Sequence, residues 1–452
     1  LIGNVLTKAT QFLLLPLYTK YINPNDFGTY DLHIAYITFL SSILFFDIWG
    51  GIMRFMFDYK EHNEKAKPVT NGLIIFASST FVYTIVVAIM GVFFNISYIG
   101  WLYLYGLSAN IAQVVGYVAR ALKKDYIFAI GGFLGTLVNV ASNIIFIALL
   151  QYGYKYMYVS YCLGMIVNVL FVGINIRFYQ LIKREYFDKT LFISMLQFAM
   201  PLSLNSAAFW FLTSYNKIVI NQQLSVTQNG MYAVANKFSA MINLVTQCFQ
   251  MAWQELTFSK AGCNKEEMGL FYTKAINEYI KFLSFGTLAL IPMIKIIFPY
   301  MIDASYSDAE NLIPFTLIGA LFSCISSFVA SIISTIKKNR MIFTTTIMGS
   351  VVNIVFIHLF IGTIGIYAAV CSLAMGYIVV VIRRIMLLRK YISIHIDKKM
   401  IFLLSTGFAM VCFIYIKRSP WENFLCLCVL CFIIIYSYKE LLKKMYMKLR
   451  GR

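Results

Sequence analysis

Two stretches of this sequence place cations and amides on single faces of helices that are otherwise apolar. Near the start of the chain, Asn4, Lys8 and Gln11 follow the i, i+4, i+7 spacing that puts three side chains on one helical face. A second apolar helix carries Asn236, Asn243 and Gln247 along one face, and Lys237 lies beside that face. Cations and amides inside a membrane suit an anion held by charge and hydrogen bonds, because buried charge there is costly and usually functional.

Three further charged residues are candidates for the same site, and each has a second interpretation. Lys217 stands at the end of an apolar segment, where it either contributes to the site or extends its ammonium group to the lipid headgroups. Arg54 ends another segment, where topology alone also explains a positive charge. Asp47 precedes Arg54 on the same face and either binds a coupling cation, Na⁺ or H⁺, or neutralises a lysine.

The helices that must position these residues are membrane spans. The chain is 60% hydrophobic and 13% charged, with a mean hydropathy of +0.74, whereas a soluble domain carries about 25% charged residues. A span takes about 20 apolar residues, and about 14 such segments can be placed between residue 2 and residue 438. Their long unbroken apolar runs exclude a β-barrel, whose strands alternate apolar and polar residues. We therefore expect an all-α membrane protein with about 14 transmembrane helices.

The net charge of +19 is informative about topology. Lys and Arg gather in alternate loops and in the C-terminal tail, and such residues stay on the cytoplasmic side during insertion. We expect a multi-pass protein of the inner, cytoplasmic membrane with both termini in the cytoplasm. No basic domain stands clear of the membrane, so nucleic acid is not an expected partner. The basic tail is expected to contact anionic membrane lipids.

Catalytic signatures are missing from the sequence. There is no phosphate-binding P-loop or nucleophile triad, and the loops are too short for the catalytic domain of a membrane-embedded polysaccharide polymerase. Cys426, Cys428 and Cys431 lie in an apolar helix without histidine or carboxylate neighbours, so we expect them to pack and not to bind a metal. We expect no cofactor and no enzymatic activity.

The chain also repeats itself. The segment KKDYIFAIGGFLGTLVN, residues 123–139, returns without a gap as KKNRMIFTTTIMGSVVN, residues 337–353, and Gly28-x-Tyr30 returns as Gly230-x-Tyr232. Chance similarity between apolar helices is the alternative to duplication. A shift of six spans keeps the orientation, so duplication predicts two parallel six-helix lobes around a central cavity. The expected boundaries are 1–189 and 190–392, with two extra helices and the basic tail in 393–452.

The stretch LLLPLYTKYINPNDFGTYDL, residues 13–32, and the arginine in WGGIMRFMF, residues 49–57, resemble a known family. They are similar to the Wzx-type polysaccharide flippases of O-antigen and capsule repeat units, within the multidrug, oligosaccharidyl-lipid and polysaccharide (MOP) exporter superfamily. The motifs occupy about the first sixty residues and are typical of the family without indicating a substrate.

The resemblance implies a transporter that moves oligosaccharides linked by pyrophosphate to undecaprenol from the inner to the outer leaflet by alternating access. It also implies membrane lipids, a polysaccharide polymerase and other assembly proteins as partners, and we expect a monomer. A cation-coupled multidrug antiporter of the same superfamily stays open as an alternative, and a membrane-embedded polysaccharide polymerase is a less favoured one because of the short loops. An antiporter for organic cations needs carboxylates in its cavity, whereas the deep residues here, Lys8 and Lys237 against Asp47, are net basic.

Overall fold

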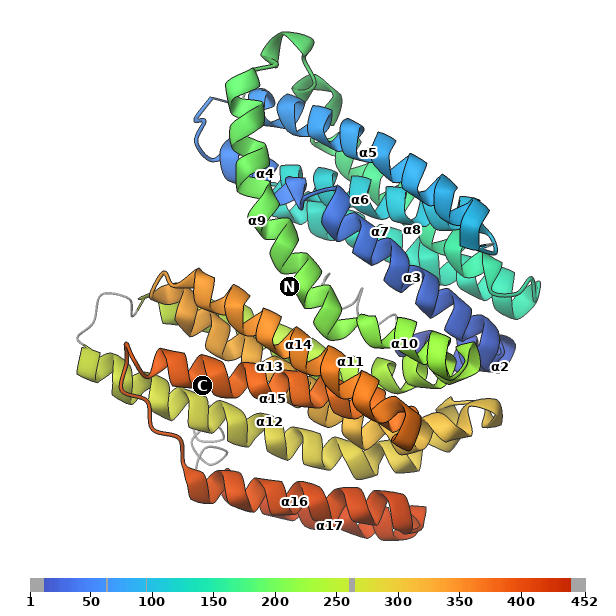
Figure 1. Ribbon diagram of the computed structural model, residues 1–452, viewed down its shortest axis with the longest axis vertical. Helices are drawn as coiled ribbons and strands as arrows, with labels where there is room; N and C mark the ends of the chain where they lie inside the picture. The colour runs from blue at the N-terminus through green and yellow to red at the C-terminus, as the bar shows by residue number, and fades with distance from the viewer. Residues whose placement is uncertain (1–11, 62–63, 95, 260–264, 440–452) are drawn as a thin grey trace, which may run out of the picture. The chain divides into compact units, whose positions relative to one another are not determined.

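The computed structural model describes residues 12–61, 64–94, 96–259 and 265–439, and these residues form helices and short connections (Figure 1). The helices run in chain order as α2 (Leu15–Tyr21), α3 (Pro24–Leu44), α4 (Ile48–Met56), α5 (Ala66–Phe94), α6 (Ile99–Ala121), α7 (Asp125–Asn143), the π-helix η1 (Ile144–Leu149), α8 (Lys155–Asn175), the short η2 (Phe178–Leu181) and η3 (Arg184–Tyr186), α9 (Lys189–Thr213), α10 (Tyr215–Gln223), α11 (Val226–Ser259), α12 (Lys265–Met301), η4 (Ala304–Leu312), α13 (Ile313–Thr335), α14 (Asn339–Ile364), α15 (Tyr367–Leu388), α16 (Lys398–Lys417) and α17 (Pro420–Ser437).

The predicted all-α membrane architecture is confirmed. Ten of the described helices are long and apolar enough to cross a membrane, and the bent pair α3 and α4 raises the number to eleven. Two of the predicted spans, near 98–119 and 229–254, coincide with the long helices α6 and α11, which are outside that set of ten. Most of the first predicted span, near 2–19, lies outside the described residues.

The repeated segment has the same backbone structure in both copies. Lys123 and Lys337 both adopt the left-handed conformation, with φ of 60° and 56°. This backbone conformation is uncommon for residues other than glycine. In both copies the backbone N–H groups of the basic pair donate to carbonyl oxygens three and five positions earlier. In the first copy Lys123 donates to Arg120 (2.9 Å) and Lys124 to Ala119 (2.9 Å). In the second copy Lys337 donates to Ser334 (3.0 Å) and Lys338 to Ile333 (3.3 Å). Such a match of backbone detail favours duplication over chance similarity.

The second repeated pair begins α3 and α11. The Asn23 side chain accepts a hydrogen bond from the Asp26 N–H (2.8 Å), and the Ser225 hydroxyl accepts one from the Gln228 N–H (3.1 Å), so a polar side chain caps each helix. The two helix starts lie against each other through their glycines. A Cβ atom on Gly28 would overlap the carbonyl oxygen of Val226, and one on Gly230 would overlap the carbonyl oxygen of Pro24.

A third correspondence links α9 with α16. The Asn71 amide donates to the carbonyl oxygen of Tyr186 (2.9 Å) and accepts from the N–H of Asp188 (3.1 Å), and Asp188 caps α9. The Asn277 amide holds the segment before α16 in the same way, through the carbonyl oxygen of His395 (2.9 Å) and the N–H of Asp397 (3.1 Å), and Asp397 caps α16. The C-terminal pair of helices therefore begins as a further repeat would begin.

By their packing, the residues group into two units. The first comprises Leu1–Ala233 and Thr346–Ala369, and the second comprises Val234–Thr345 and Val370–Arg452. In the first unit α7 packs on α8, where Gly135 and Gly164 allow the two backbones to approach closely. In the second unit α12 packs on α13, α16 and α17. This grouping does not test the lobe boundaries expected at residues 189 and 392, which stay predictions.

Candidate functional site at the break between α3 and α4

The span formed by α3 and α4 is broken at residues 45–47, nearer to its C-terminal end. The two helices meet at an angle of 44°. Phe46 and Asp47 at the break have φ of 54° and 49°, so two consecutive residues other than glycine adopt the left-handed conformation. A helix break frees backbone carbonyls, and these need partners at membrane depth. The hydroxyl of Ser203 on α9 donates to the carbonyl oxygen of Ser42 (2.7 Å) and provides one such partner.

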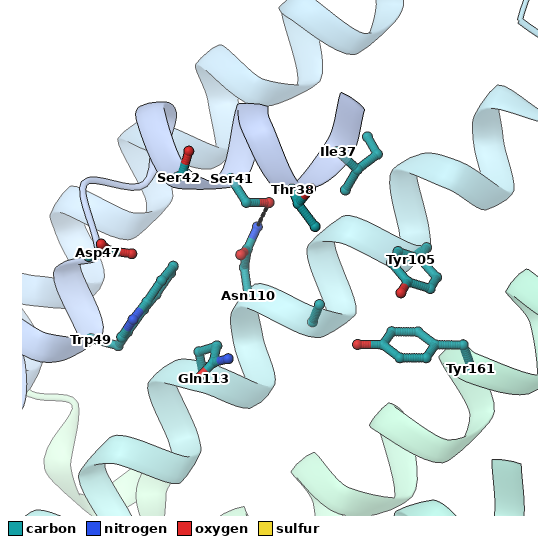
Figure 2. A pocket seen from close by; sticks show the side chains of 11 residues that line it. Ile37, Thr38, Ser41, Ser42, Asp47, Trp49, Tyr105, Asn110, Gln113 and Tyr161 are labelled. Carbon is teal, nitrogen blue, oxygen red and sulfur yellow. Dashed lines mark hydrogen bonds between the residues drawn. The ribbon is translucent and has the colours of Figure 1, made fainter. Parts of the chain in front are cut away.

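A cavity of about 280 Å³ lies beside the break (Figure 2). Residues of α3, α4, α6 and α8 and of the break itself line it, all within the first unit: Ile37, Thr38, Ser41, Ser42, Asp47, Trp49, Tyr105, Ala109, Asn110, Gln113 and Tyr161. Irregular backbone inside a membrane is tolerated where it lines a cavity, and broken helices of transporters commonly form the binding site. The break and the cavity therefore form the candidate site.

The lining combines one carboxylate with amides, hydroxyls and aromatic rings. The Ser206 hydroxyl of α9 donates to Oδ2 of Asp47 and holds the carboxylate in place. The Asn110 amide donates to the Ser41 hydroxyl (3.0 Å). Tyr105 and Tyr161 stack with their ring centroids 3.9 Å apart. The wall can bind neutral hydroxyl-bearing groups through its amides and carboxylate, and flat apolar faces through its rings.

Of the site residues that the sequence predicts, Asp47 lines the cavity. Arg54, at the other end of α4, forms an ion pair with Asp58 (2.5 Å), and both side chains are more than half exposed. Lys217 of α10 forms an ion pair with Asp31 of α3 (2.9 Å), and the two side chains are 18% and 13% exposed. The structure thus shows each of these two cations beside a carboxylate, outside the cavity lining.

The remaining predicted residues lie in two places. Asn4, Lys8 and Gln11 are outside the described residues, as is the Gln247 side chain. Asn236 and Lys237 are half-buried on α11, and Asn243 accepts a weak hydrogen bond from the thiol of Cys324 (3.2 Å). Nothing in the described chain therefore tests the joint site predicted for Lys8 and Lys237.

The sequence does not reveal several residues of the site. Nothing in the sequence distinguishes Trp49, Asn110 and Gln113, because tryptophans and single amides occur in many apolar helices. Asp31 cannot be recognised from the sequence, because its partner, Lys217, is 186 positions away along the chain. Its second carboxylate oxygen is buried and has no hydrogen-bond partner among the described residues. Within the described chain no three His, Cys, Asp or Glu side chains gather as metal ligands would.

Comparisons with known proteins give the family and the fold. The family described as "Polysaccharide biosynthesis protein" matches residues 1–253, which is more than half of the chain. No curated protein sequence matches this chain. Among solved structures, "Lipid II flippase MurJ, inward closed conformation" has a TM-score of 0.76 at 15% identity and covers 98% of this chain and 99% of its own.

Multidrug transporters share the same architecture. An inward-facing multidrug resistance MATE family transporter of the MOP superfamily has a TM-score of 0.69 at 16% identity and covers 88% of this chain and 95% of its own. A MATE structure in the straight conformation has a TM-score of 0.59 at 17% identity and covers 90% of this chain and 94% of its own. These likenesses show the fold. The chain belongs to the family of polysaccharide biosynthesis proteins and has the fold of the MOP-superfamily transporters.

Proposed function

We propose that this protein is a flippase for lipid-linked oligosaccharides. Its cargo is an oligosaccharide joined by pyrophosphate to an isoprenoid carrier, undecaprenol, which it moves from the inner to the outer leaflet by alternating access. O-antigen and capsule repeat units are cargoes of this class. The family match over residues 1–253 supports polysaccharide biosynthesis as the process, and the fold supports transport as the activity.

The observation that carries the proposal is the polar and aromatic cavity at the broken span. A lipid-linked oligosaccharide must bring its hydrophilic head through the membrane interior, so the protein needs hydrogen-bonding groups at that depth. Asp47, Asn110 and Gln113 supply such groups beside a helix break whose freed carbonyl is satisfied by Ser203. A structural core without a ligand would favour apolar side chains at these positions, because buried polar groups are costly.

The pyrophosphate needs cations, and Lys8 and Lys237 remain our candidates with Asn4, Gln11, Asn236, Asn243 and Gln247. Arg54 and Lys217 are weaker candidates than their charge suggests, because each forms an ion pair with an aspartate. Either one could bind the pyrophosphate only after that pair separates. Asp47 stays the candidate for coupling to Na⁺ or H⁺.

A cation-coupled multidrug antiporter is the second candidate function. Asp47 favours it, since a carboxylate beside aromatic rings attracts an organic cation by charge and by cation–π contact. The amides of Asn110 and Gln113 favour the flippase, since hydroxyl-rich ligands use both the donor and the acceptor of an amide. We also propose a monomer in the cytoplasmic membrane, with both termini in the cytoplasm and a polysaccharide polymerase and other assembly proteins as partners.

Complementation tests the proposed function. The protein is expressed in strains that lack their own flippase and differ in their repeat unit, and surface polysaccharide is measured with the protein level checked by blot. We expect export to return in at least one strain. A normally abundant protein that restores export in none, yet lowers the accumulation of ethidium in cells, would replace the flippase by the antiporter.

A further inference from the structure

We propose that the cavity beside the break between α3 and α4 is a subsite for a single uncharged sugar ring of the cargo. The proposal rests on the proposed function, because it takes the cargo to carry sugars. It specifies that this cavity binds one sugar ring of the cargo and that this ring must be uncharged. The cavity residues Trp49, Gln113, Asn110 and Asp47 carry it.

The size of the cavity fits one ring. Its volume of about 280 Å³ is just under the range of about 300 to 1,000 Å³ found for drug-sized ligands. A whole oligosaccharide with its pyrophosphate is too large for this space. One ring fits, and the rest of the cargo must then lie outside the cavity.

The lining has the two surfaces that a sugar ring requires. A pyranose has an apolar face of C–H groups and a rim of hydroxyls that donate and accept hydrogen bonds. Trp49 offers a flat indole face, and the stacked Tyr105 and Tyr161 lie across the hollow from it (Figure 2). Asn110 and Gln113 project from α6 between these aromatic walls in the same view. The hydroxyl rim would meet these amides while the C–H face lies on a ring.

The Gln113 amide is the group that is free to bind. It is exposed on the cavity wall and makes no hydrogen bond within the described chain. Neighbouring hydroxyl protons are already used, since Thr38 donates to the carbonyl oxygen of Ala35 (2.9 Å) and Ser42 donates to that of Phe39 (2.8 Å). Their oxygens remain available as acceptors. An amide that donates and accepts, with acceptor oxygens around it, matches a hydroxyl-bearing ligand.

The charge of the lining sets the specificity. Asp47 is the one acidic residue among the eleven that line the cavity, and none of the eleven is a lysine or arginine. Two like charges close together in a medium of low dielectric constant repel strongly. The cavity should therefore accept a hexose or an N-acetylhexosamine and reject a uronic acid of similar size.

The test measures sugar binding to the purified full-length protein by saturation-transfer NMR. The probes are methyl glucoside, N-acetylglucosamine and glucuronate, each at millimolar concentration. We expect saturation of the ring protons of the two neutral sugars and a signal at least about threefold weaker for glucuronate. Gln113→Ala should weaken neutral-sugar binding about three- to tenfold, as expected for one lost hydrogen bond. Trp49→Ala should weaken it about tenfold, because stacking and apolar contact are both lost.

Matched variants elsewhere in the chain control for general damage. Trp421→Ala removes an exposed tryptophan of α17, and Gln180→Ala removes an exposed glutamine of η2. Both should leave sugar binding unchanged. Because Gln113 is exposed, Gln113→Ala is expected to fold normally even if Trp49→Ala does not.

Three results would overturn the subsite. One is neutral-sugar binding that Gln113→Ala and a folded Trp49→Ala leave unchanged. Another is absence of neutral-sugar binding in the unaltered protein. The third is binding of tetraphenylphosphonium that needs Asp47, without any sugar signal, which would make the cavity a site for organic cations.

Glycan export separates this failure from failure of the function. Export that is restored by the protein without any sugar bound to the cavity would contradict the subsite and leave the flippase standing. Neutral-sugar binding that depends on Gln113, in a protein that restores export in no strain, would contradict the flippase and leave a sugar site.

Discussion

Replacing Gly28 by alanine should force apart the starts of α3 and α11. The added Cβ atom would overlap the carbonyl oxygen of Val226 and would lie 2.7 Å from the nitrogen of Gly230, whereas ordinary contact begins at 3.4 Å. Both neighbouring atoms belong to the backbone, so no side-chain rotation relieves the overlap. Because the carbonyl oxygen is the closer of the two atoms, the helices must separate by about 1.4 Å at this point to restore ordinary contact.

The expected cost follows from measurements on overpacked cores, about 1 to 3 kcal/mol. Such a cost changes an equilibrium about five- to 150-fold, since 1.4 kcal/mol is tenfold. For a unit of this size the melting temperature should fall by about 2 to 12 °C. Thermal unfolding of the purified protein, followed with a thiol-reactive dye, measures the change. Gly230→Ala should have a similar effect, because its Cβ atom would overlap the carbonyl oxygen of Pro24.

Two other glycines provide the controls. Gly100 and Gly132 lie in helices, and an added Cβ atom at either would meet no atom within 4 Å. Gly100→Ala and Gly132→Ala should leave the melting temperature unchanged or raise it slightly, because alanine favours a helix. If Gly28→Ala and Gly230→Ala melt at the same temperature as these controls, the close approach of α3 and α11 is wrong.

Three further predictions concern charges and topology. Asp31→Asn should destabilise the protein by about 1 to 3 kcal/mol, because Lys217 is left poorly paired in a half-buried place; an unchanged melting temperature would contradict this, and exchanging the two charges should restore stability. Lys237→Glu should lower glycan export about tenfold to a hundredfold and Lys237→Arg much less; normal export by normally abundant Lys237→Glu would make this lysine structural. Reporter fusions after Tyr98 and Asp303 should report the outside of the cell, and a reversed result at both would refute the cytoplasmic termini.

Much of the fold could be predicted from the sequence because the spans are long and apolar and because the repeat is ungapped. The repeat is visible because its two copies keep the basic pair, the glycine and the Val-Asn pair at the same spacing, and the structure shows the same left-handed turn at Lys123 and Lys337. The break at Phe46 and Asp47 was not predictable. No glycine occupies the left-handed positions, and the sequence around them reads as one continuous apolar span.

The site could be predicted only in part. Asp47 is recognisable because a carboxylate in an apolar helix is rare and usually functional. The pair of Arg54 with Asp58 has the four-residue spacing of a helical ion pair and was readable in principle. The pair of Lys217 with Asp31 and the assembly of Trp49 with residues of α6 depend on tertiary packing, which residue type and spacing do not specify.

The central claim is that this protein moves a lipid-linked oligosaccharide across the membrane. Its most direct test is reconstitution of the purified protein into liposomes that contain a fluorescent undecaprenyl-pyrophosphate oligosaccharide in both leaflets. Dithionite added outside bleaches the fluorophores of the outer leaflet at once, and those of the inner leaflet only after they cross. We expect bleaching of more than half of the fluorescence in protein-containing vesicles and of about half in empty vesicles, since each leaflet holds about half of the label. Bleaching that stops at about half in both preparations, with folded protein present in the vesicles, would contradict the flippase.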